Sequence, residues 1–118
     1  MKRICVFCGS NPGNEPVFLE TAQNLGELVP KKDIDLVYGG GRVGLMGKIA
    51  DTVLANGGRA IGIIPESLAQ KEVAHLGLTE LHVVESMHTR KALMAELSDG
   101  FIAMPGGFGT FEEICEII

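Results

Sequence analysis

The sequence predicts an α/β domain built on a doubly wound parallel sheet. Short apolar runs alternate with longer segments of helical periodicity throughout the 118 residues. These runs are continuous instead of alternating with polar residues, which is typical of strands buried on both faces. Three of them are followed directly by glycine-rich stretches. Strands that alternate with helices favour a parallel sheet with right-handed crossovers and helices on both of its faces.

The predicted strands are short and separated by clear end signals. They cover residues 3–8, 34–38, 59–64, 81–84 and 100–104. Glycine breaks the second run at Gly39, and Pro65 closes the third because proline lacks the N–H that a strand ladder needs. The order of these runs predicts a Rossmann-like sheet in a single domain that covers residues 1–118.

Apolar residues recur at helical spacing between the strands. The expected helices cover residues 15–29, 43–55 and 86–97, with a further helix beginning at residue 110 and a short helix or irregular turn at 67–76. We expect Pro30 to end the first helix and Gly57–Gly58 to end the second. Ser86 is expected to cap the helix at 86–97, since its side chain can accept an N–H group of the first turn.

The last predicted helix has no end signal in the sequence. Residues 111–118 contain no glycine and no C-cap pattern, so the helix is still running at Ile118. We therefore expect the domain to be incomplete at its C-terminus, with further residues of the domain beyond Ile118.

The composition excludes several classes of partner. The net charge of −5 lacks the basic footprint of nucleic-acid-binding proteins. No apolar run approaches the length of about 18 residues that a membrane span needs, and the apolar run at the start is too short for a signal peptide. Three cysteines suit a reducing compartment. We expect a cytoplasmic protein with no nucleic-acid or membrane partner.

Neither a metal nor a cofactor is expected. The three histidines, His75, His82 and His88, match no metal-ligand spacing. Cys5 and Cys8 form a C-x-x-C, but residues three apart on a strand point to opposite faces. We therefore interpret them as small buried hydrophobic side chains.

Three glycine-rich loops follow predicted strands and should meet at one edge of the sheet, where ligands bind in such folds. The first contains Gly9 and Ser10. The second spans residues 39–44, contains Gly40 and Gly41, and reads G-x-G-x-x-G before a helix. The alternative is that these glycines serve only close strand–helix packing. A dinucleotide site is a further alternative, with Glu66 as the acidic residue about 20 positions on that such a site needs.

The third loop, at residues 105–110, carries the sharper motif. Its glycines allow backbone N–H groups to face an anion, and Thr110 adds a hydroxyl at the start of the next helix. Glu113 could serve catalysis, but Thr110 and Glu113 also have the spacing of a capping box, in which the glutamate only bonds back to the helix start.

Arg90 is a second candidate for a functional residue of the site. It lies near the start of the helix capped by Ser86, on the apolar stripe, with Lys91 beside it. Two cations at a helix N-terminus oppose the helix dipole, and a partly buried arginine needs an anionic partner. That partner is either a structural carboxylate, or a ligand or catalytic carboxylate held bidentately.

Four motifs in this order resemble the LONELY GUY (LOG) family of cytokinin riboside 5′-monophosphate phosphoribohydrolases. They read C-G-S at residues 8–10, G-G-G-R-V-G-L-M-G at 39–47, M-H-T-R-K at 87–91 and P-G-G-F-G-T-F-E-E at 105–113. The resemblance covers the whole chain, and the last motif is highly specific. Many relatives are described as possible lysine decarboxylases.

The resemblance implies a Rossmann-like fold, a dimer or larger homo-oligomer, and no metal. It implies hydrolysis of AMP or of an N6-modified riboside 5′-monophosphate to free base and ribose 5-phosphate. Arg90 and Glu113 would be the catalytic pair. The expected substrate-binding residues are Gly9, Ser10, Gly40, Gly41, Glu72, Lys91, Gly106, Gly107, Gly109, Thr110 and Glu112. Lysine decarboxylation has no support, because no pyridoxal-phosphate pattern surrounds Lys91.

Two other functions fit parts of the sequence. A non-catalytic carrier or sensor would use the glycine loops to hold a nucleotide or cofactor without chemistry, as in the similar molybdenum-cofactor carrier proteins. A dinucleotide-dependent oxidoreductase would use residues 39–44 and Glu66. The Arg90 and Glu113 pair argues against the first, and the short chain without a separate substrate domain argues against the second.

Overall fold

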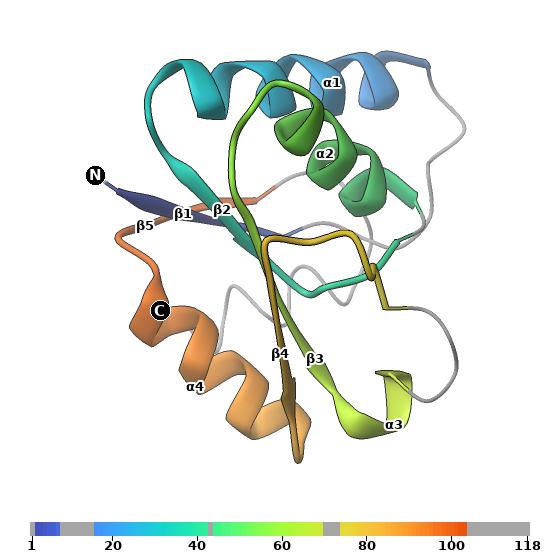
Figure 1. The fold of residues 1–118 in the computed structure, drawn as a ribbon, viewed down its shortest axis with the longest axis vertical. Helices are drawn as coiled ribbons and strands as arrows, with labels where there is room; N and C mark the ends of the chain where they lie inside the picture. The colour runs from blue at the N-terminus through green and yellow to red at the C-terminus, as the bar shows by residue number, and fades with distance from the viewer. Residues whose placement is uncertain (1, 8–15, 43, 70–73, 104–118) are drawn as a thin grey trace.

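The sheet has five parallel strands in the order β4-β3-β2-β1-β5. The computed structural model describes residues 2–7, 16–42, 44–69 and 74–103 (Figure 1). The strands are β1 (Arg3–Phe7), β2 (Asp35–Tyr38), β3 (Ala60–Pro65), β4 (Glu80–Val84) and β5 (Gly100–Ala103). All five predicted strands are confirmed, each to within one residue over its described part.

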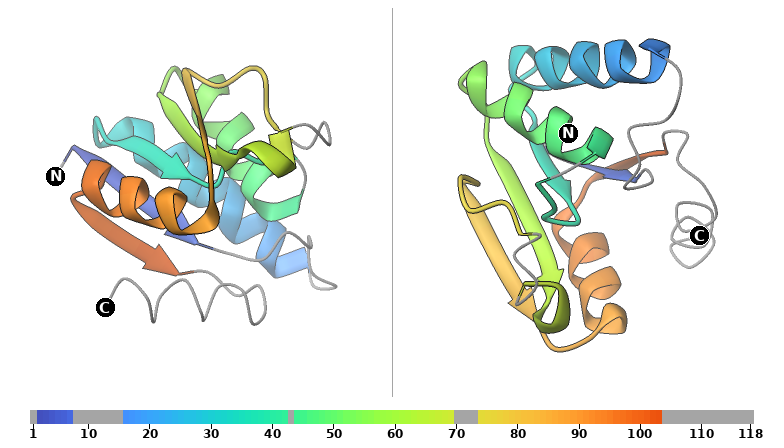
Figure 2. Two further views of the ribbon diagram at one scale, coloured as in Figure 1. Left: turned by 90° about the horizontal axis from the view of Figure 1, so that it is seen from below. Right: turned by 90° about the vertical axis from the view of Figure 1, so that its right-hand side faces the viewer.

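Helices cover both faces of this sheet. They are α1 (Pro16–Lys31), α2 (Gly44–Ala55), α3 (Glu66–Ala69) and α4 (Met87–Leu97). Figure 2 shows α1 and α2 together on one face and α4 on the other. The chain moves outward from β1 to β4 and then returns to the far side of β1 as β5. A right-handed crossover in the reverse direction places its helix on the opposite face, which accounts for the position of α4.

The core is divided between the two faces by the alternation of side chains along each strand. Ile4 and Val6 pack with α1 and α2, whereas Cys5 packs with Met94 of α4. The apolar stripe predicted on α2 is confirmed, since Met46, Ile49, Ala50 and Val53 are all buried. Cys5 is fully buried, as expected of a small hydrophobic side chain, and Cys8 lies outside the described residues. Among the described helices, none is long and apolar enough to cross a bilayer.

Two helix ends follow their sequence signals. Gly57 has a φ of 80°, which suits glycine, and the N–H groups of Gly57 and Gly58 bond to the carbonyls of Leu54 and Val53 at 3.1 and 2.9 Å. This is the Schellman arrangement that stops α2. Ser86 caps α4 as predicted, because its hydroxyl accepts the N–H of Thr89 at 3.2 Å.

The predicted end of α1 is wrong by two residues. The helix continues through Pro30 to Lys31. A proline in the last turn removes only one intrahelical hydrogen bond, because its own N–H is missing. The turn is closed beyond it instead, where the N–H groups of Lys32 and Ile34 bond to the carbonyls of Leu28 and Val29 at 3.2 and 3.1 Å. Of the segment predicted at 67–76, a short helix forms at its start, as α3, and residues 70–73 lie outside the described residues.

Asp99 joins the amino ends of β1 and β5. Its Oδ2 accepts the backbone N–H groups of Lys2 and Arg3, both at 3.0 Å, and its own N–H bonds to the carbonyl of Arg3 at 2.9 Å. These hydrogen bonds to Lys2 and Arg3 lower the pKa of the Asp99 carboxyl below its usual value of 3.8. The charged form is therefore the one that the folded state prefers.

Folding stability should fall in acid partly through Asp99. A carboxyl whose pKa is lowered in the folded state stabilises the protein above its unfolded pKa, and this contribution is lost as the pH falls through the folded pKa. Urea midpoints measured from pH 7 downward should therefore drop less below pH 3.8 in Asp99→Asn than in the wild type. Glu96→Gln, an exposed change on α4, should follow the wild-type curve. Parallel curves for Asp99→Asn and the wild type would contradict this reading.

Candidate functional site

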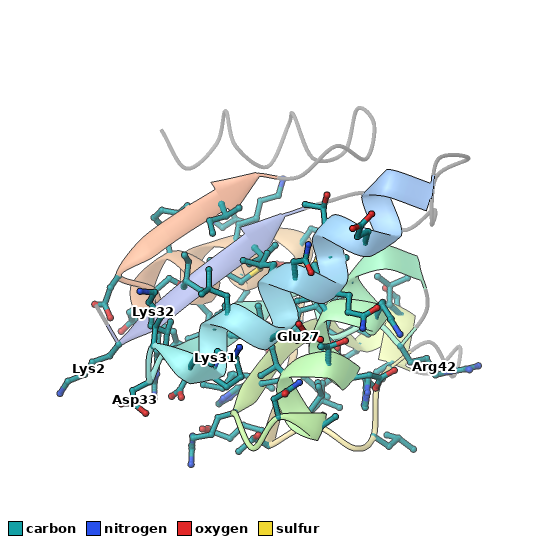
Figure 3. All side chains as sticks on the ribbon, turned by 90° about the horizontal axis from the view of Figure 1, so that it is seen from above. Lys2, Glu27, Lys31, Lys32, Asp33 and Arg42 are labelled. Atoms are coloured by element: carbon teal, nitrogen blue, oxygen red, sulfur yellow. The ribbon has the colours of Figure 1, made fainter. Side chains whose placement is uncertain are left out.

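The strands that lead into the three glycine-rich loops are neighbours in the sheet. β1 lies between β2 and β5, with Cys5 opposite Val37 and Phe7 opposite Ala103. The loops therefore begin at one edge, beside the point where the strand order reverses, which is where open α/β sheets bind ligands. Figure 3 shows Arg42, from the loop after β2, projecting at the end of the molecule opposite to Lys2 and Asp33.

The described residues include four of the predicted site residues: Gly40, Gly41, Arg90 and Lys91. The others lie outside the described residues: Gly9, Ser10, Glu72, Gly106, Gly107, Gly109, Thr110, Glu112 and Glu113. The meeting of Arg90 with Glu113, and the anion cradle at 105–110, therefore stay predictions.

Arg90 reaches from the first turn of α4 to the carboxyl ends of two strands. Its Nε donates to the carbonyl of Ile63 at 2.9 Å, and its Nη2 donates to the carbonyl of Gly39 at 2.8 Å. Nη1 lies 3.5 Å from the sulfur of Met87. The sequence analysis considered carboxylate and ligand partners for Arg90, whereas these partners are main-chain carbonyls. Two bonds from different nitrogens fix the plane of the guanidinium, which places a positive charge of defined orientation at this edge. Lys91 follows it on α4 and is half-buried.

Gly39 is required because Arg90 occupies the space of its side chain. A Cβ at Gly39 would collide with Nη2 of Arg90, and its three nearest neighbours are all atoms of that guanidinium. Gly47 of α2 is constrained in a similar way, because a Cβ there would collide with the carbonyl of Arg42. The packing interpretation of these two glycines is thus supported, and a phosphate role of the 39–44 loop remains a prediction.

Gly40 and Gly41 are held by the segment at 74–77. Gly40 has a φ of 79°, which favours glycine, and its carbonyl accepts the N–H of His75 at 2.8 Å. Gly41 forms an isolated antiparallel bridge with Ala74. The carbonyl of Gly41 also accepts the hydroxyl of Tyr38 at 2.7 Å. The glycine loop is therefore bound by α4 at one residue and by the 74–77 segment at the next two.

Tyr38 contributes a buried hydroxyl beneath the loop. Tyr38 is fully buried, and burial, with a smaller effect of the negative charge of Asp51, raises the pKa of its hydroxyl well above the usual value of 10. The hydroxyl therefore keeps its proton and remains a donor to Gly41. Oδ1 of Asp51 also lies 2.6 Å from Nε2 of His75.

A hollow of about 510 Å³ opens beside this network. Its lining residues are Arg42, Ala69, Ala74, His75, Leu76 and Gly77. The volume lies in the range of small-molecule sites, which are mostly apolar with a few placed polar groups. Here the polar groups are the cation of Arg42 and the imidazole of His75.

The sequence analysis missed Tyr38, Asp51 and His75. Their partners lie 3 and 24 residues away along the chain, and no motif spacing relates them. Nε2 of His82 lies 3.3 Å from Oε1 of Glu80 on β4, and His88 is exposed on α4. In the described part of the chain, no three His, Cys, Asp or Glu side chains are grouped so that they could hold a metal ion.

A double-mutant cycle tests the contact between Gly39 and Arg90. Gly39→Ala should destabilise the protein by about 1–3 kcal/mol, since the new methyl group displaces the guanidinium. In the Arg90→Ala background the same change should cost at least about 1 kcal/mol less, because residues in contact are not additive. The free energy of unfolding from urea titrations of the four proteins gives both values. Additive losses would show that Arg90 does not determine the choice of glycine at position 39.

The sequence is similar to a known family and to proteins with assigned names. Residues 46–118 match the family described as "Possible lysine decarboxylase". The chain is 53% identical over 118 residues to a cytokinin riboside 5′-monophosphate phosphoribohydrolase of Rhodococcoides fascians, covering 99% of this chain and 60% of that relative. It is also 53% identical over 116 residues to a probable enzyme of the same name from Oryza sativa subsp. japonica, covering 98% and 52%.

The fold is similar to that of a solved molybdenum cofactor binding protein from Rippkaea orientalis. The TM-score is 0.79 at 25% identity, and the match covers 98% of this chain and 69% of that one. The chain spans 52 to 60% of the length of the two curated relatives above. The family match covers more than half of the chain, and it agrees with the motifs and with the Rossmann-like sheet. The chain belongs to the LOG family, the family described as possible lysine decarboxylases.

Proposed function

We propose that this chain is the nucleotide-binding part of a phosphoribohydrolase. The reaction is hydrolysis of the N-glycosidic bond of AMP, or of an N6-modified riboside 5′-monophosphate, to free base and ribose 5-phosphate. The observation that carries the proposal is the guanidinium of Arg90, fixed by the carbonyls of Gly39 and Ile63 at the edge where the glycine loops begin. The names of the two curated relatives support the same reaction.

The chemistry requires a carboxylate. Cleavage of a ribosyl–base bond builds positive charge on the sugar ring, as in glycoside hydrolysis. A carboxylate beside the ring stabilises that charge and can position or deprotonate the attacking water. Glu113 is the proposed carboxylate. The new C–O bond forms between water and the anomeric carbon, and the bonding electrons of the C–N bond leave with the base, which takes up a proton.

Arg90 is proposed to orient Glu113 and to keep it ionised. Its guanidinium is already fixed in plane by two main-chain carbonyls, so little freedom is lost when it binds an anion. Arginine can hold a carboxylate through two parallel N–H groups, which fixes direction as well as distance. The same cation favours the charged form of a neighbouring carboxylate.

The remaining predicted residues are proposed to bind the nucleotide. Backbone N–H groups of the loop at 105–110 would hold the 5′-phosphate and so align the sugar with Glu113. Gly9, Ser10, Gly40, Gly41, Glu72, Lys91, Gly106, Gly107, Gly109, Thr110 and Glu112 complete the proposed binding set. A homodimer or larger homo-oligomer and a cytoplasmic location belong to the same proposal. Lysine decarboxylation is not proposed, because the sequence around Lys91 has no pyridoxal-phosphate pattern.

The experiment is direct. The full protein is mixed with AMP and, separately, with N6-isopentenyl-AMP, and free base and ribose 5-phosphate are quantified by chromatography. Equal amounts of the two products support the proposal, and the ratio of kcat/KM for the two nucleotides gives the substrate preference. Tight binding of nucleotide without release of base would favour a carrier or sensor instead. That outcome would agree with the fold shared with the molybdenum cofactor binding protein.

Glu113→Gln should abolish base release while nucleotide binding persists. The amide keeps the shape of the side chain but cannot stabilise the cationic sugar or accept a proton, so kcat should fall by about 10²–10⁴-fold. Calorimetric titration with AMP should give a Kd close to that of the wild type. Near-normal turnover of the variant would reduce Glu113 to a helix cap.

Arg90→Ala should lower both turnover and affinity. Its loss removes the cation that orients the catalytic carboxylate, and kcat/KM should fall by about 10²-fold or more. The matched control is Arg59→Ala, which removes a cation that pairs with Asp35 on β2 at 3.6 Å and with Glu80 on β4 at 3.1 Å. Kinetic constants of Arg90→Ala equal to those of the control would assign Arg90 a structural role only.

A further inference from the structure

The pair formed by His75 and Asp51 lies outside the proposed catalytic set but is joined to it by hydrogen bonds through the glycine loop. We propose that this pair is a positioning element that holds the 74–77 segment against the glycine loop and so sets the affinity of the site for its nucleotide. The inference rests on the proposed function, because it assigns the pair a role in the same reaction.

Both ring nitrogens of His75 are engaged inside the protein. The N–H of Gly77 donates to Nδ1 at 3.0 Å, so Nδ1 carries no proton. Nε2 therefore carries the proton and donates to Oδ1 of Asp51 at 2.6 Å. A hydrogen bond to a charged acceptor is stronger than one between neutral groups. The His75 side chain is only 13% exposed, whereas that of Asp51 is 62% exposed, so the imidazole is the member of the pair that is enclosed.

The same residue is also fixed through its backbone. The N–H of His75 bonds to the carbonyl of Gly40, and Ala74 bridges to Gly41. Gly40 directly follows Gly39, whose carbonyl binds Arg90. The 74–77 segment thus connects α2, through Asp51, to the loop residue next to the acceptor of the proposed catalytic arginine. Movement of the segment would change the loop at that point.

The segment also forms most of one wall of the hollow. Among the described residues that line it, Ala74, His75, Leu76 and Gly77 come from this segment, and Arg42 comes from the glycine loop itself. Leu76 is 89% exposed, so side-chain burial of that residue does not hold the segment in place. If the segment is in place only part of the time, the apparent dissociation constant rises by the inverse of that fraction. Once the nucleotide is bound, the reacting groups have the same geometry, so kcat changes little.

The test measures KM and kcat of variants of the full protein and compares each constant with that of the wild type. His75→Phe keeps a ring of similar size but loses both bonds, and Asp51→Ala removes the acceptor at an exposed helical position. Each should raise the KM for AMP about tenfold, equivalent to about 1.4 kcal/mol, with kcat within about threefold of wild type. The double variant should be no worse than His75→Phe alone, because the bond that Asp51→Ala removes is already lost in that variant. Asp51→Asn retains an acceptor oxygen for Nε2–H and should restore KM to within about threefold.

The matched control is His82→Phe, which breaks another histidine–carboxylate contact, to Glu80 on β4. Its kinetic constants should equal those of the wild type. Unchanged KM in both His75→Phe and Asp51→Ala, a fall of kcat without a rise of KM, or additive effects in the double variant would each overturn the proposal. Asp51→Ala alone decides the matter if His75→Phe fails to fold.

Hydrogen exchange keeps this inference separate from the proposed function. The amide of Gly77, which donates to His75, should exchange at least about tenfold faster in His75→Phe than in the wild type. This holds whether or not the protein releases base. A wild-type protein that releases no base from any nucleotide would refute the proposed function alone. Unchanged exchange at Gly77 in an active enzyme would refute the positioning role alone.

Discussion

The site depends on one interaction, the binding of the Arg90 guanidinium to two main-chain carbonyls. Gly39 directly follows β2, Ile63 lies in the second half of the adjacent strand β3, and their carbonyls accept the Nη2 and Nε groups of Arg90. Both residues come directly after Tyr38 and Gly62, the last pair between β2 and β3, and backbone carbonyls need partners when they are not solvated. An arginine from the opposite layer satisfies them and gains a fixed orientation in return. Arg90 thereby links the first turn of α4 to β3 and to the residue after β2, and it places its positive charge between them.

This arrangement restricts the sequence around it. A guanidinium that lies flat on the loop leaves no room for a side chain at Gly39. The next residue takes a positive φ, and its carbonyl is used by the 74–77 segment. The glycines of this loop are therefore needed for protein packing as well as for any approach to a ligand. A glycine-rich pattern after a strand can have either cause, and the contact between Gly39 and Arg90 is an example of packing.

Sequence periodicity was sufficient for the fold because each element has a local signal. The inner strands β2 and β3 are buried, α2 has a clear apolar stripe, and Ser86 and Gly57 mark helix ends by their own chemistry, whereas Val83 and Phe101 on the edge strands β4 and β5 are exposed. The end of α1 was predicted wrongly at Pro30. A proline in the last turn of a helix removes only one hydrogen bond, so tertiary packing decides where the helix ends. The contacts at the site could not be predicted in the same way. Arg90 bonds to residues 27 and 51 positions away, and His75 pairs with Asp51 24 positions away, through geometry that only the assembled sheet provides.

The bonds between Asp99 and the first residues of the chain have a consequence for biosynthesis. β1 is an interior strand, but one of its two neighbours, β5, is translated last among the described strands. While the ribosome is still making the intervening residues, one side of β1 has unpaired N–H and C=O groups, and these can pair with another nascent chain. The order of strands that creates a ligand-binding edge therefore also delays closure of the sheet until the polypeptide has passed residue 100.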